Sequence, residues 1–337
     1  MTTTSSKTTE APATGESAEA TETAVPTTAP ASTRPPHAAG SSHRTTGSAY
    51  PTTGSAHDAT DNAHDDNASD HGYVHGYSPA EARRLGNQAD TLAELLHAGT
   101  AYPAGSRVLE AGCGVGAQTV HLLASSPGAE LTAADLSADS LDQARARVAA
   151  QAPDARVTWH HGDLHELPFA DASFDHLFVC FVLEHLADPS AALTALRRVL
   201  RPGGTITVIE GDHGSTLFHP DSAAGRATVG QLVHLQAAAG GDALLGRRLH
   251  PLLAGAGFRD VAVRPLTVSV DGSRPALVEG FTRRTFIAMV ESVRADALAA
   301  GLTTAAAFDR GIADLRRAGE EGGTFHYTFF KAVGVNP

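Results

Sequence analysis

The stretch VIEGDHGST, residues 208–216, brings two carboxylates and an imidazole together just after an apolar run. Glu210, Asp212 and His213 lie within four positions, so they could handle a proton, form an ion-paired turn or line a solvated loop. His213 is the candidate base, because an adjacent carboxylate can fix the tautomer of an imidazole and raise its basicity. We therefore interpret Glu210 and Asp212 as residues that orient His213.

A second stretch that could form part of a site lies earlier in the chain and is rich in small residues: VLEAGCGVGAQT, residues 108–119. Its glycines at 112, 114 and 116 allow a tight turn and a close approach of the backbone to a ligand. Ligands of open α/β sheets bind at this place, at the carboxyl ends of the strands. Gly112, Gly114 and Ala117 also satisfy the dinucleotide pattern G-x-G-x-x-A. Asp135, at the end of the next expected strand, suits ribose hydroxyls whichever cofactor binds.

Two further carboxylates favour a cationic ligand over a dinucleotide. Glu110 directly precedes the glycine turn, where its charge would repel a pyrophosphate and attract a cation. Asp163, in GDLHELPF, follows the third expected strand and can accept a hydrogen bond from an exocyclic amine. The paired-glycine turn of LRPGGTI then introduces the fifth strand.

In this order, the motifs resemble those of the class I S-adenosylmethionine-dependent methyltransferases, particularly the small-molecule, ubiquinone-methyltransferase-like group. The resemblance covers residues 106–212 and implies S-adenosyl-L-methionine as the cofactor. It implies that the glycine loop holds the methionine moiety and that Asp135 takes the ribose. The cofactor-binding residues that it implies are Glu110, Gly112, Cys113, Gly114, Gly116, Asp135, Leu136, Asp163, Leu164 and Cys180.

The segment before the first strand contributes to the same expectation. In similar enzymes a tyrosine and a helix at this position close over the cofactor, and Tyr77, Arg84 and Gln88 are the candidates here. Arg84 could pair with the methionine carboxylate through its planar guanidinium, or it could simply be a solvated helix arginine. Tyr77 also joins His213, Glu210 and Asp212 as a candidate catalytic residue.

The activity implied by the resemblance is methyl transfer by direct displacement to a small, partly aromatic metabolite, at oxygen or nitrogen, in secondary metabolism. C-methylation of an electron-rich ring such as indole is the close alternative. A catalytically silent cofactor-binding or regulatory protein and an NAD(P)-dependent oxidoreductase are alternatives of other classes. Further residues that could contact the acceptor are Glu184, His185, His219, His250 and Tyr327.

Alternating strands and helices from residue 106 predict an α/β fold. We expect a Rossmann-like, seven-stranded, mostly parallel sheet with helices on both faces and a helical cap from late insertions. The expected organisation is a disordered tail (1–72), an N-terminal helical segment (73–105), a methyltransferase core (106–212, 251–271 and 323–335) and a helical cap (213–250 and 272–322).

Composition limits the partners. The net charge is −12, and the chain has two lysines, Lys7 and Lys331, which argues against nucleic acid. No run of residues approaches the length of a membrane span. Two cysteines predict neither a disulfide framework nor a zinc site, and the irregularly spaced histidines of the tail do not predict a metal site. We expect a cytoplasmic protein with a small-molecule acceptor and consider a homodimer.

Overall fold

Seven strands form one sheet in the computed structural model, which describes residues 78–337. The predictions for the 1–72 tail and for Tyr77 lie outside the described residues. The strands are β1 (Arg107–Ala111), β2 (Glu130–Asp135), β3 (Val157–His161), β4 (Phe174–Cys180), β5 (Leu200–His219), β6 (Arg259–Asp271) and β7 (Thr324–Val335).

The order of the strands across the sheet is β3-β2-β1-β4-β5-β7-β6. The pairings of β1 with β2 and β4, of β2 with β3 and of β4 with β5 are parallel, whereas β7 runs antiparallel to β5 and β6. The chain order reverses beside β1, which leaves a crevice at the carboxyl ends of β1 and β4, where such sheets bind ligands. The predicted Rossmann-like, mostly parallel fold is confirmed.

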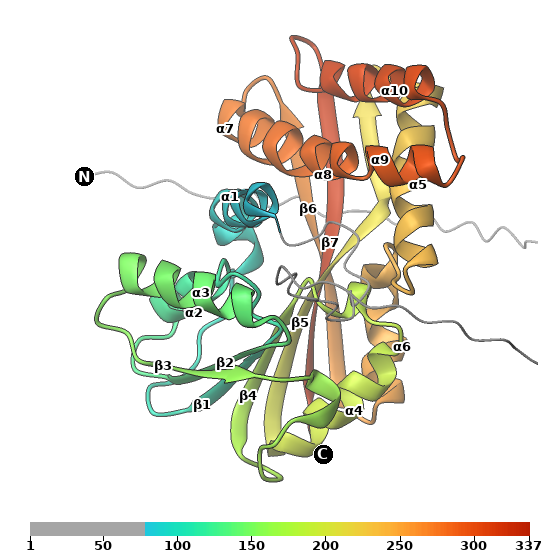
Figure 1. The fold of residues 1–337 in the computed structure, drawn as a ribbon. Helices are drawn as coiled ribbons and strands as arrows, with labels where there is room; N and C mark the ends of the chain where they lie inside the picture. Colours follow the sequence, from blue (N-terminus) through green and yellow to red (C-terminus); the bar gives the residue numbers. More distant parts are fainter. Residues whose placement is uncertain (1–77) are drawn as a thin grey trace, which may run out of the picture. The chain divides into compact units, whose positions relative to one another are not determined.

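Helices cover both faces of the sheet and add a cap above it (Figure 1). The α-helices are α1 (Pro79–Leu96), α2 (Thr119–Ser125), α3 (Ala138–Gln151), α4 (Pro189–Val199), α5 (Ala223–Ala238), α6 (Leu249–Gly255), α7 (Pro275–Leu277), α8 (Ala288–Ser292), α9 (Arg294–Ala299) and α10 (Ala305–Arg317). The short 3₁₀ helices are η1 (Leu164–Glu166), η2 (Leu183–His185) and η3 (Leu245–Arg248), and η4 (Val278–Ile287) is a π-helix.

The two faces of β1 show why the strands are buried on both sides. Leu109 and Ala111 pack in one apolar cluster with side chains of α4 and α6, whereas Val108 belongs to the cluster that contains residues of α1 and α2. Successive side chains of a strand point to opposite faces, so a strand covered by helices on both sides is apolar throughout. This packing fixes the strand ends that carry the site.

Helix α1 begins with a side-chain cap and a proline. Ser78 is the N-cap and its hydroxyl accepts a hydrogen bond from the Glu81 amide at 3.2 Å, while Pro79 occupies the first helical position. The face of α1 that carries Leu92 and Leu96 is buried in the core. The part of α1 around Gln88 faces the crevice.

The fifth strand is longer than expected. β5 continues to His219 and pairs with β7, with an irregularity in the register between Asp212 and Leu217. The predicted boundary at residue 213, with helical structure to follow, is therefore wrong for residues 213–219. Hydrogen bonding to the long β7 keeps this segment extended, which the glycine and polar residues of the local sequence did not indicate.

The cap consists of α5 and of α7 to α10 with η4, packed on the extended ends of β5, β6 and β7 in the upper half of Figure 1. Residues 275–318 of the predicted helical cap contain five short helical segments. The cap and the sheet share a single apolar cluster, to which Phe281, Phe286 and Phe329 belong.

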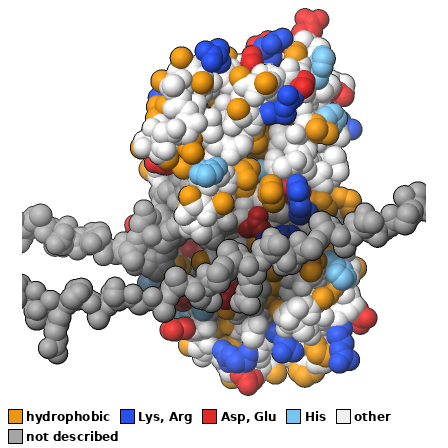
Figure 2. All heavy atoms as spheres, turned by 90° about the vertical axis from the view of Figure 1, so that its right-hand side faces the viewer, with side chains coloured by type: hydrophobic (Ala, Val, Ile, Leu, Met, Phe, Trp, Pro, Cys, Tyr) orange, Lys and Arg blue, Asp and Glu red, His pale blue; other side chains and the backbone are white. Residues whose placement is uncertain are grey.

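Charged side chains are mixed on the surface. On the face shown in Figure 2, Lys and Arg side chains are interspersed with Asp and Glu among the described residues. None of the described helices is long and apolar enough to cross a membrane. Within residues 78–337, no group of three or more His, Cys, Asp or Glu side chains is arranged to hold a metal ion.

Candidate active site

The glycine turn after β1 depends on two glycines in different ways. Gly112 has φ +74°, and a Cβ there would lie 2.5 Å from Cγ2 of Val182. Gly114 has φ +51°, and a Cβ there would have no neighbour within 4 Å. The first glycine therefore permits close packing inside the protein, and the second leaves its α-carbon facing open space. Bare backbone facing a crevice is suited to close contact with a ligand.

Asp135 at the end of β2 holds this turn in place. Its Oδ2 accepts a hydrogen bond from the Gly114 amide at 2.7 Å, and its Oδ1 accepts one from the Ser137 amide at 2.9 Å. Burial raises the pKa of this carboxyl group, while the amide hydrogen bonds oppose the shift. A carboxylate can accept about four hydrogen bonds, so Asp135 retains acceptor capacity for ribose hydroxyls.

A pocket of about 460 Å³ opens in front of the turn. Helix α1 and the ends of β2 and β4 contribute to its wall. The predicted cofactor-binding residues that line it are Gly112, Cys113, Gly114, Asp135, Leu136, Asp163, Leu164, Cys180 and Gln88. Pockets of this size are typical of small-molecule and cofactor sites. The crevice predicted from the motifs is thus present and is formed by most of the residues expected there.

Glu110, which the resemblance places beneath the methionine moiety, does not line this pocket. Its side chain is buried behind the turn, and its Oε2 accepts a hydrogen bond from the Thr119 hydroxyl at 2.7 Å. Burial raises the pKa of Glu110 to about 8, and the neighbouring Asp135 adds to the shift. Glu110 therefore supports the loop and helix α2 from within, because the strand's alternation turns it away from the ligand side.

Arg84 also lies elsewhere than predicted. Its guanidinium forms two hydrogen bonds with Glu81, at 2.6 and 2.8 Å, and a third with Oε1 of Gln88 at 2.9 Å. The three side chains follow one another along one face of α1 at helical spacing. Gln88 reaches the glycine-loop pocket, whereas Arg84 lines a smaller cavity beside it.

Asp163 is held in place by His165, which follows it by two positions in the sequence. Its Oδ1 accepts a hydrogen bond from the His165 amide at 2.8 Å and lies 2.7 Å from Nδ1 of the same histidine. Hydrogen bonds to Asp163 and to the Asp188 carbonyl outweigh burial and raise the pKa of His165. His165 lines the pocket and was not predicted, although it belongs to the quoted GDLHELPF motif.

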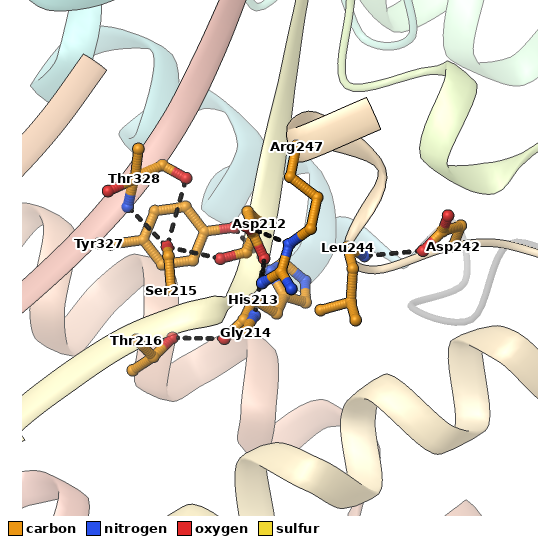
Figure 3. A network of polar contacts seen from close by, with 10 residues as sticks. All are labelled: Asp212, His213, Gly214, Ser215, Thr216, Asp242, Leu244, Arg247, Tyr327 and Thr328. Carbon is orange, nitrogen blue, oxygen red and sulfur yellow. Dashed lines mark hydrogen bonds and ion pairs between the residues drawn. The ribbon is translucent and has the colours of Figure 1, made fainter. Parts of the chain in front are cut away.

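The smaller cavity, of about 50 Å³, lies between the glycine-loop pocket and the cap. His213 lines it from β5, and its Nδ1 lies 2.6 Å from the Tyr327 hydroxyl of β7 (Figure 3). Burial and the nearby Arg84 charge lower the pKa of His213 to about 4, so the imidazole is neutral at pH 7. The other lining residues are Leu85, Gln88, Phe181, Glu184, His185, Gly211, Phe281, Thr285, Phe286, Met289 and Phe329.

The two predicted orienting carboxylates do not contact the His213 imidazole. Glu210 accepts hydrogen bonds from the amides of Val182 and Leu183, at 3.1 and 2.8 Å. Asp212 instead pairs with Arg247 at 2.7 and 2.8 Å (Figure 3). Successive strand residues face opposite sides, which separates His213 from Asp212 in spite of their adjacency in sequence.

The group that orients His213 is therefore a phenol from the last strand. Tyr327 lies 114 positions away in sequence, and no local signal connects it with His213. Of the other weaker candidates, Glu184 and His185 line the smaller cavity, whereas His219 and His250 are exposed and line neither pocket. Burial and the neighbouring His213 lower the pKa of His185 to about 3.

Comparison with known proteins agrees with this geometry. Residues 109–208 match the family described as a methyltransferase domain. An uncharacterised 37.1 kDa protein of the Streptomyces fradiae transposon TN4556 is 37% identical over 194 residues, which cover 57% of this chain and 54% of the relative. Methyltransferase GfsG of Streptomyces halstedii is 33% identical over 138 residues, covering 40% and 49%.

A demethylmenaquinone methyltransferase of Clavibacter sepedonicus is 41% identical over 107 residues, which cover 32% of this chain and 42% of the relative. Among solved structures, a Haemonchus contortus phosphoethanolamine N-methyltransferase 2 aligns with a TM-score of 0.47 at 21% identity, covering 74% of this chain and 52% of that one. This chain spans about half the length of the curated relatives that it matches. Residues 109–208 therefore form a methyltransferase domain, in agreement with the predicted resemblance.

Proposed function

We propose that the protein transfers a methyl group from S-adenosyl-L-methionine to a small, partly aromatic metabolite, at oxygen or nitrogen. The observation that carries this proposal is that the two cavities are adjacent and share part of their walls. Leu85, Gln88, Phe181 and His185 line both the glycine-loop pocket and the smaller cavity. A cofactor in the first space would therefore have its reactive end beside an acceptor in the second.

The residues of the larger pocket fit this cofactor. The open backbone at Gly114 leaves room for the methionine moiety, and the free lone pairs of Asp135 suit the ribose. Leu136, which is 41% exposed, and Leu164 offer apolar contacts for adenine. When bound, the cofactor supplies an electrophilic methyl group on a positively charged sulfur, and the acidic side chains of Asp135 and Asp163 favour that charge.

The smaller cavity fits an apolar or aromatic acceptor. Phe181, Phe281, Phe286, Phe329 and Met289 line it together with the neutral His213. Its present volume is smaller than an aromatic metabolite, so α1 or the π-helix η4 must move to admit one. Such π-helical segments are frequent at functional sites.

His213 is the proposed base for the acceptor's proton. Its Nδ1 is engaged with Tyr327, so the Nε2 atom is the one that can face the acceptor. Alignment of the acceptor with the methyl group can supply about 7–11 kcal/mol of the barrier, and a base typically adds about 10²–10⁴-fold. The residues of this chain thus contribute mainly positioning, exclusion of water and removal of one proton.

Replacement of His213 tests whether this residue acts as the base that removes the acceptor's proton. We expect His213→Ala to lower turnover at least about tenfold, with cofactor affinity near that of the wild type. His219→Ala is the matched control, because His219 is exposed at the end of the same strand. Turnover would be measured with a panel of phenols, amines and indoles, and affinity by calorimetry with S-adenosylhomocysteine. Unchanged turnover would assign His213 a purely structural role.

The same panel separates the alternatives. Methylation of an indole ring carbon would support the C-methyltransferase alternative, for which the apolar cavity is equally suited. Tight cofactor binding without any transfer would favour a regulatory protein. Thermal stabilisation by NADH but not by S-adenosylhomocysteine would refute the proposal. A cytoplasmic location and a homodimer are further predictions, which cell fractionation and analytical ultracentrifugation would test.

A further inference from the structure

Tyr327 lies at a point where two segments of the site meet. Its side chain is 2% exposed, and its hydroxyl is 2.6 Å from Nδ1 of His213. A Cβ at Gly211 would overlap this hydroxyl and would lie 3.7 Å from Oε2 of Glu184. The Tyr327 hydroxyl and the Glu184 carboxylate therefore approach the same point of the β5 backbone, and the absence of a side chain at Gly211 makes room for the hydroxyl.

Glu184 has an oxygen that its protein environment does not satisfy. Its Oε2 is buried and has no hydrogen-bond partner among residues 78–337. An unsatisfied buried carboxylate oxygen is costly and calls for a functional explanation. Glu184 also lines the smaller cavity together with His213 and Tyr327. A carboxylate is thus present in the same cavity as His213, and it comes from η2 instead of β5.

His213 alone is poorly suited to keep a proton. Its pKa is lowered to about 4, so a protonated His213 would readily pass its proton on. The pKa of Glu184 is raised to about 7 by burial, against the opposing charge of Arg84. A proton that enters at His213 is therefore more stable on Glu184. Tyr327 contacts His213 directly and is near enough to Glu184 for the charge of that carboxylate to raise the pKa of the phenol.

We propose that His213, Tyr327 and Glu184 form a proton relay, which carries the proton lost by the methyl acceptor to Oε2 of Glu184. This inference rests on the proposed methyl transfer. The acceptor atom bonds to the methyl carbon while the electron pair of the carbon–sulfur bond stays on sulfur. The acceptor's proton passes to Nε2 of His213, and the Nδ1 proton passes to the Tyr327 oxygen. The phenolic proton passes to Glu184 once movement of the cavity wall brings the Tyr327 hydroxyl within hydrogen-bond distance of Oε2.

The charges balance across this step. One positive charge on sulfur and one negative charge on Glu184 disappear together, so the closed site carries no new net charge. The proton on Glu184 returns to solvent when the product leaves. The titratable and charged groups near Glu184 are Arg84 on α1, Cys180 on β4, His185 on η2, Glu210 on β5, Asp242 before η3 and Tyr327 on β7.

The first test removes each relay group with little change of shape. We expect Glu184→Gln and Tyr327→Phe each to lower kcat about 10- to 100-fold with KM within about threefold of the wild type. The wild-type kcat should rise with pH through an apparent pKa near that of Glu184, at about 7, and Glu184→Gln should lose this dependence. Wild-type kcat and pH profile in Glu184→Gln would overturn the relay.

Matched controls use the other end of the sheet. Glu130→Gln changes an exposed carboxylate at the start of β2. Tyr102→Phe removes a buried hydroxyl that has no hydrogen-bond partner in the described part of the chain, ahead of β1. Both controls should keep turnover within about twofold of the wild type, because neither residue lies at the carboxyl ends of the strands.

A second measurement does not depend on turnover. Infrared spectroscopy should detect a buried carboxyl group that titrates near neutral pH and is absent from Glu184→Gln. Nitrogen NMR should show that Tyr327→Phe changes the tautomer equilibrium of His213. Unchanged spectra in both variants would refute the relay even in an active enzyme. A wild-type protein that methylates none of the acceptors would refute the proposed function. The spectra would then still show whether Glu184 titrates near neutral pH and whether Tyr327 sets the tautomer of His213.

Discussion

The glycine-loop pocket and the His213 cavity are neighbours, yet they are assembled in different ways. The pocket is formed by short segments that directly follow β1, β2 and β4, and its turn is held by backbone hydrogen bonds to Asp135. The cavity is formed by side chains of α1, η2, β5, η4 and β7, which lie far apart in sequence. One site depends mainly on backbone conformation, and the other on side chains brought together by folding.

This difference has a functional meaning. A backbone cradle can bind the same cofactor while surface residues change, because its conformation depends on a few glycines and one carboxylate. A cavity of side chains from cap and sheet can change its ligand by single substitutions. Loops and caps on a constant scaffold are where binding specificity usually resides. We therefore expect mutations in the two regions to separate cofactor binding from turnover.

The largest effect is expected at Gly112. Gly112→Ala introduces a Cβ 2.5 Å from Cγ2 of Val182 at a backbone conformation with φ +74°, which is unfavourable for any residue with a side chain. The turn must shift, and we expect cofactor affinity to fall about 100-fold, which corresponds to about 2.7 kcal/mol. Isothermal titration with S-adenosylhomocysteine measures this.

Gly114→Ala is the matched control for that substitution. It carries a similar backbone penalty at φ +51°, but its Cβ meets no protein atom within 4 Å. It should therefore fold with a smaller loss of stability than Gly112→Ala and should weaken binding only through contact with the ligand. Equal unfolding midpoints for the two variants would contradict the distinction drawn between the two glycines.

The next largest effect is expected at Asp135. Asp135→Ala removes the acceptor for the Gly114 and Ser137 amides as well as the proposed ribose contact. The loss of charge-assisted hydrogen bonds should weaken cofactor binding about 10- to 100-fold. Turnover at saturating cofactor should change much less, because Asp135 lies outside the smaller cavity. A large fall in kcat with normal affinity would show that the two regions are not separable.

The sequence predicted these two regions unequally. The glycine turn, Asp135 and Asp163 could be found because each belongs to a local pattern, and the alternation of strands and helices predicted the fold around them. The contact of Glu110 with Thr119 could not be predicted, because the local sequence does not show which way this buried side chain points. Tyr327 could be named as a candidate for acceptor contact, but its contact with His213 could not be predicted. The two residues are 114 positions apart and meet only through the pairing of β5 with β7.

The buried titratable groups of both regions predict opposing pH effects on stability. The lowered pKa of His213, about 4 compared with 6.5, means that the unfolded chain binds more protons between these values. The free energy of unfolding should therefore fall as pH drops through that window. The pKa of Glu110 is raised from 4.5 to about 8, so the folded chain binds more protons there and stability should fall as pH rises.

Urea unfolding as a function of pH measures the sum of these contributions. Maximum stability is expected between about pH 5 and pH 7. Glu110→Gln should flatten the decline on the alkaline side and leave the acidic side unchanged, while His213→Asn should flatten the acidic side. A decline on the alkaline side that persists in Glu110→Gln would show that another buried carboxyl group, such as Glu184, dominates it.

The smallest effect is expected at Asp212, which tests whether neighbours of His213 in sequence are neighbours in function. Asp212 is buried and pairs with Arg247, whose side chain is about half exposed, so the pair is screened by solvent. Asp212→Asn should lower the free energy of unfolding by about 1 kcal/mol and leave turnover within about twofold. A tenfold loss of turnover at unchanged stability would mean that Asp212 acts on His213 after all. The function of the smaller cavity would then depend on residues that are adjacent in sequence, as the conformation of the glycine turn does.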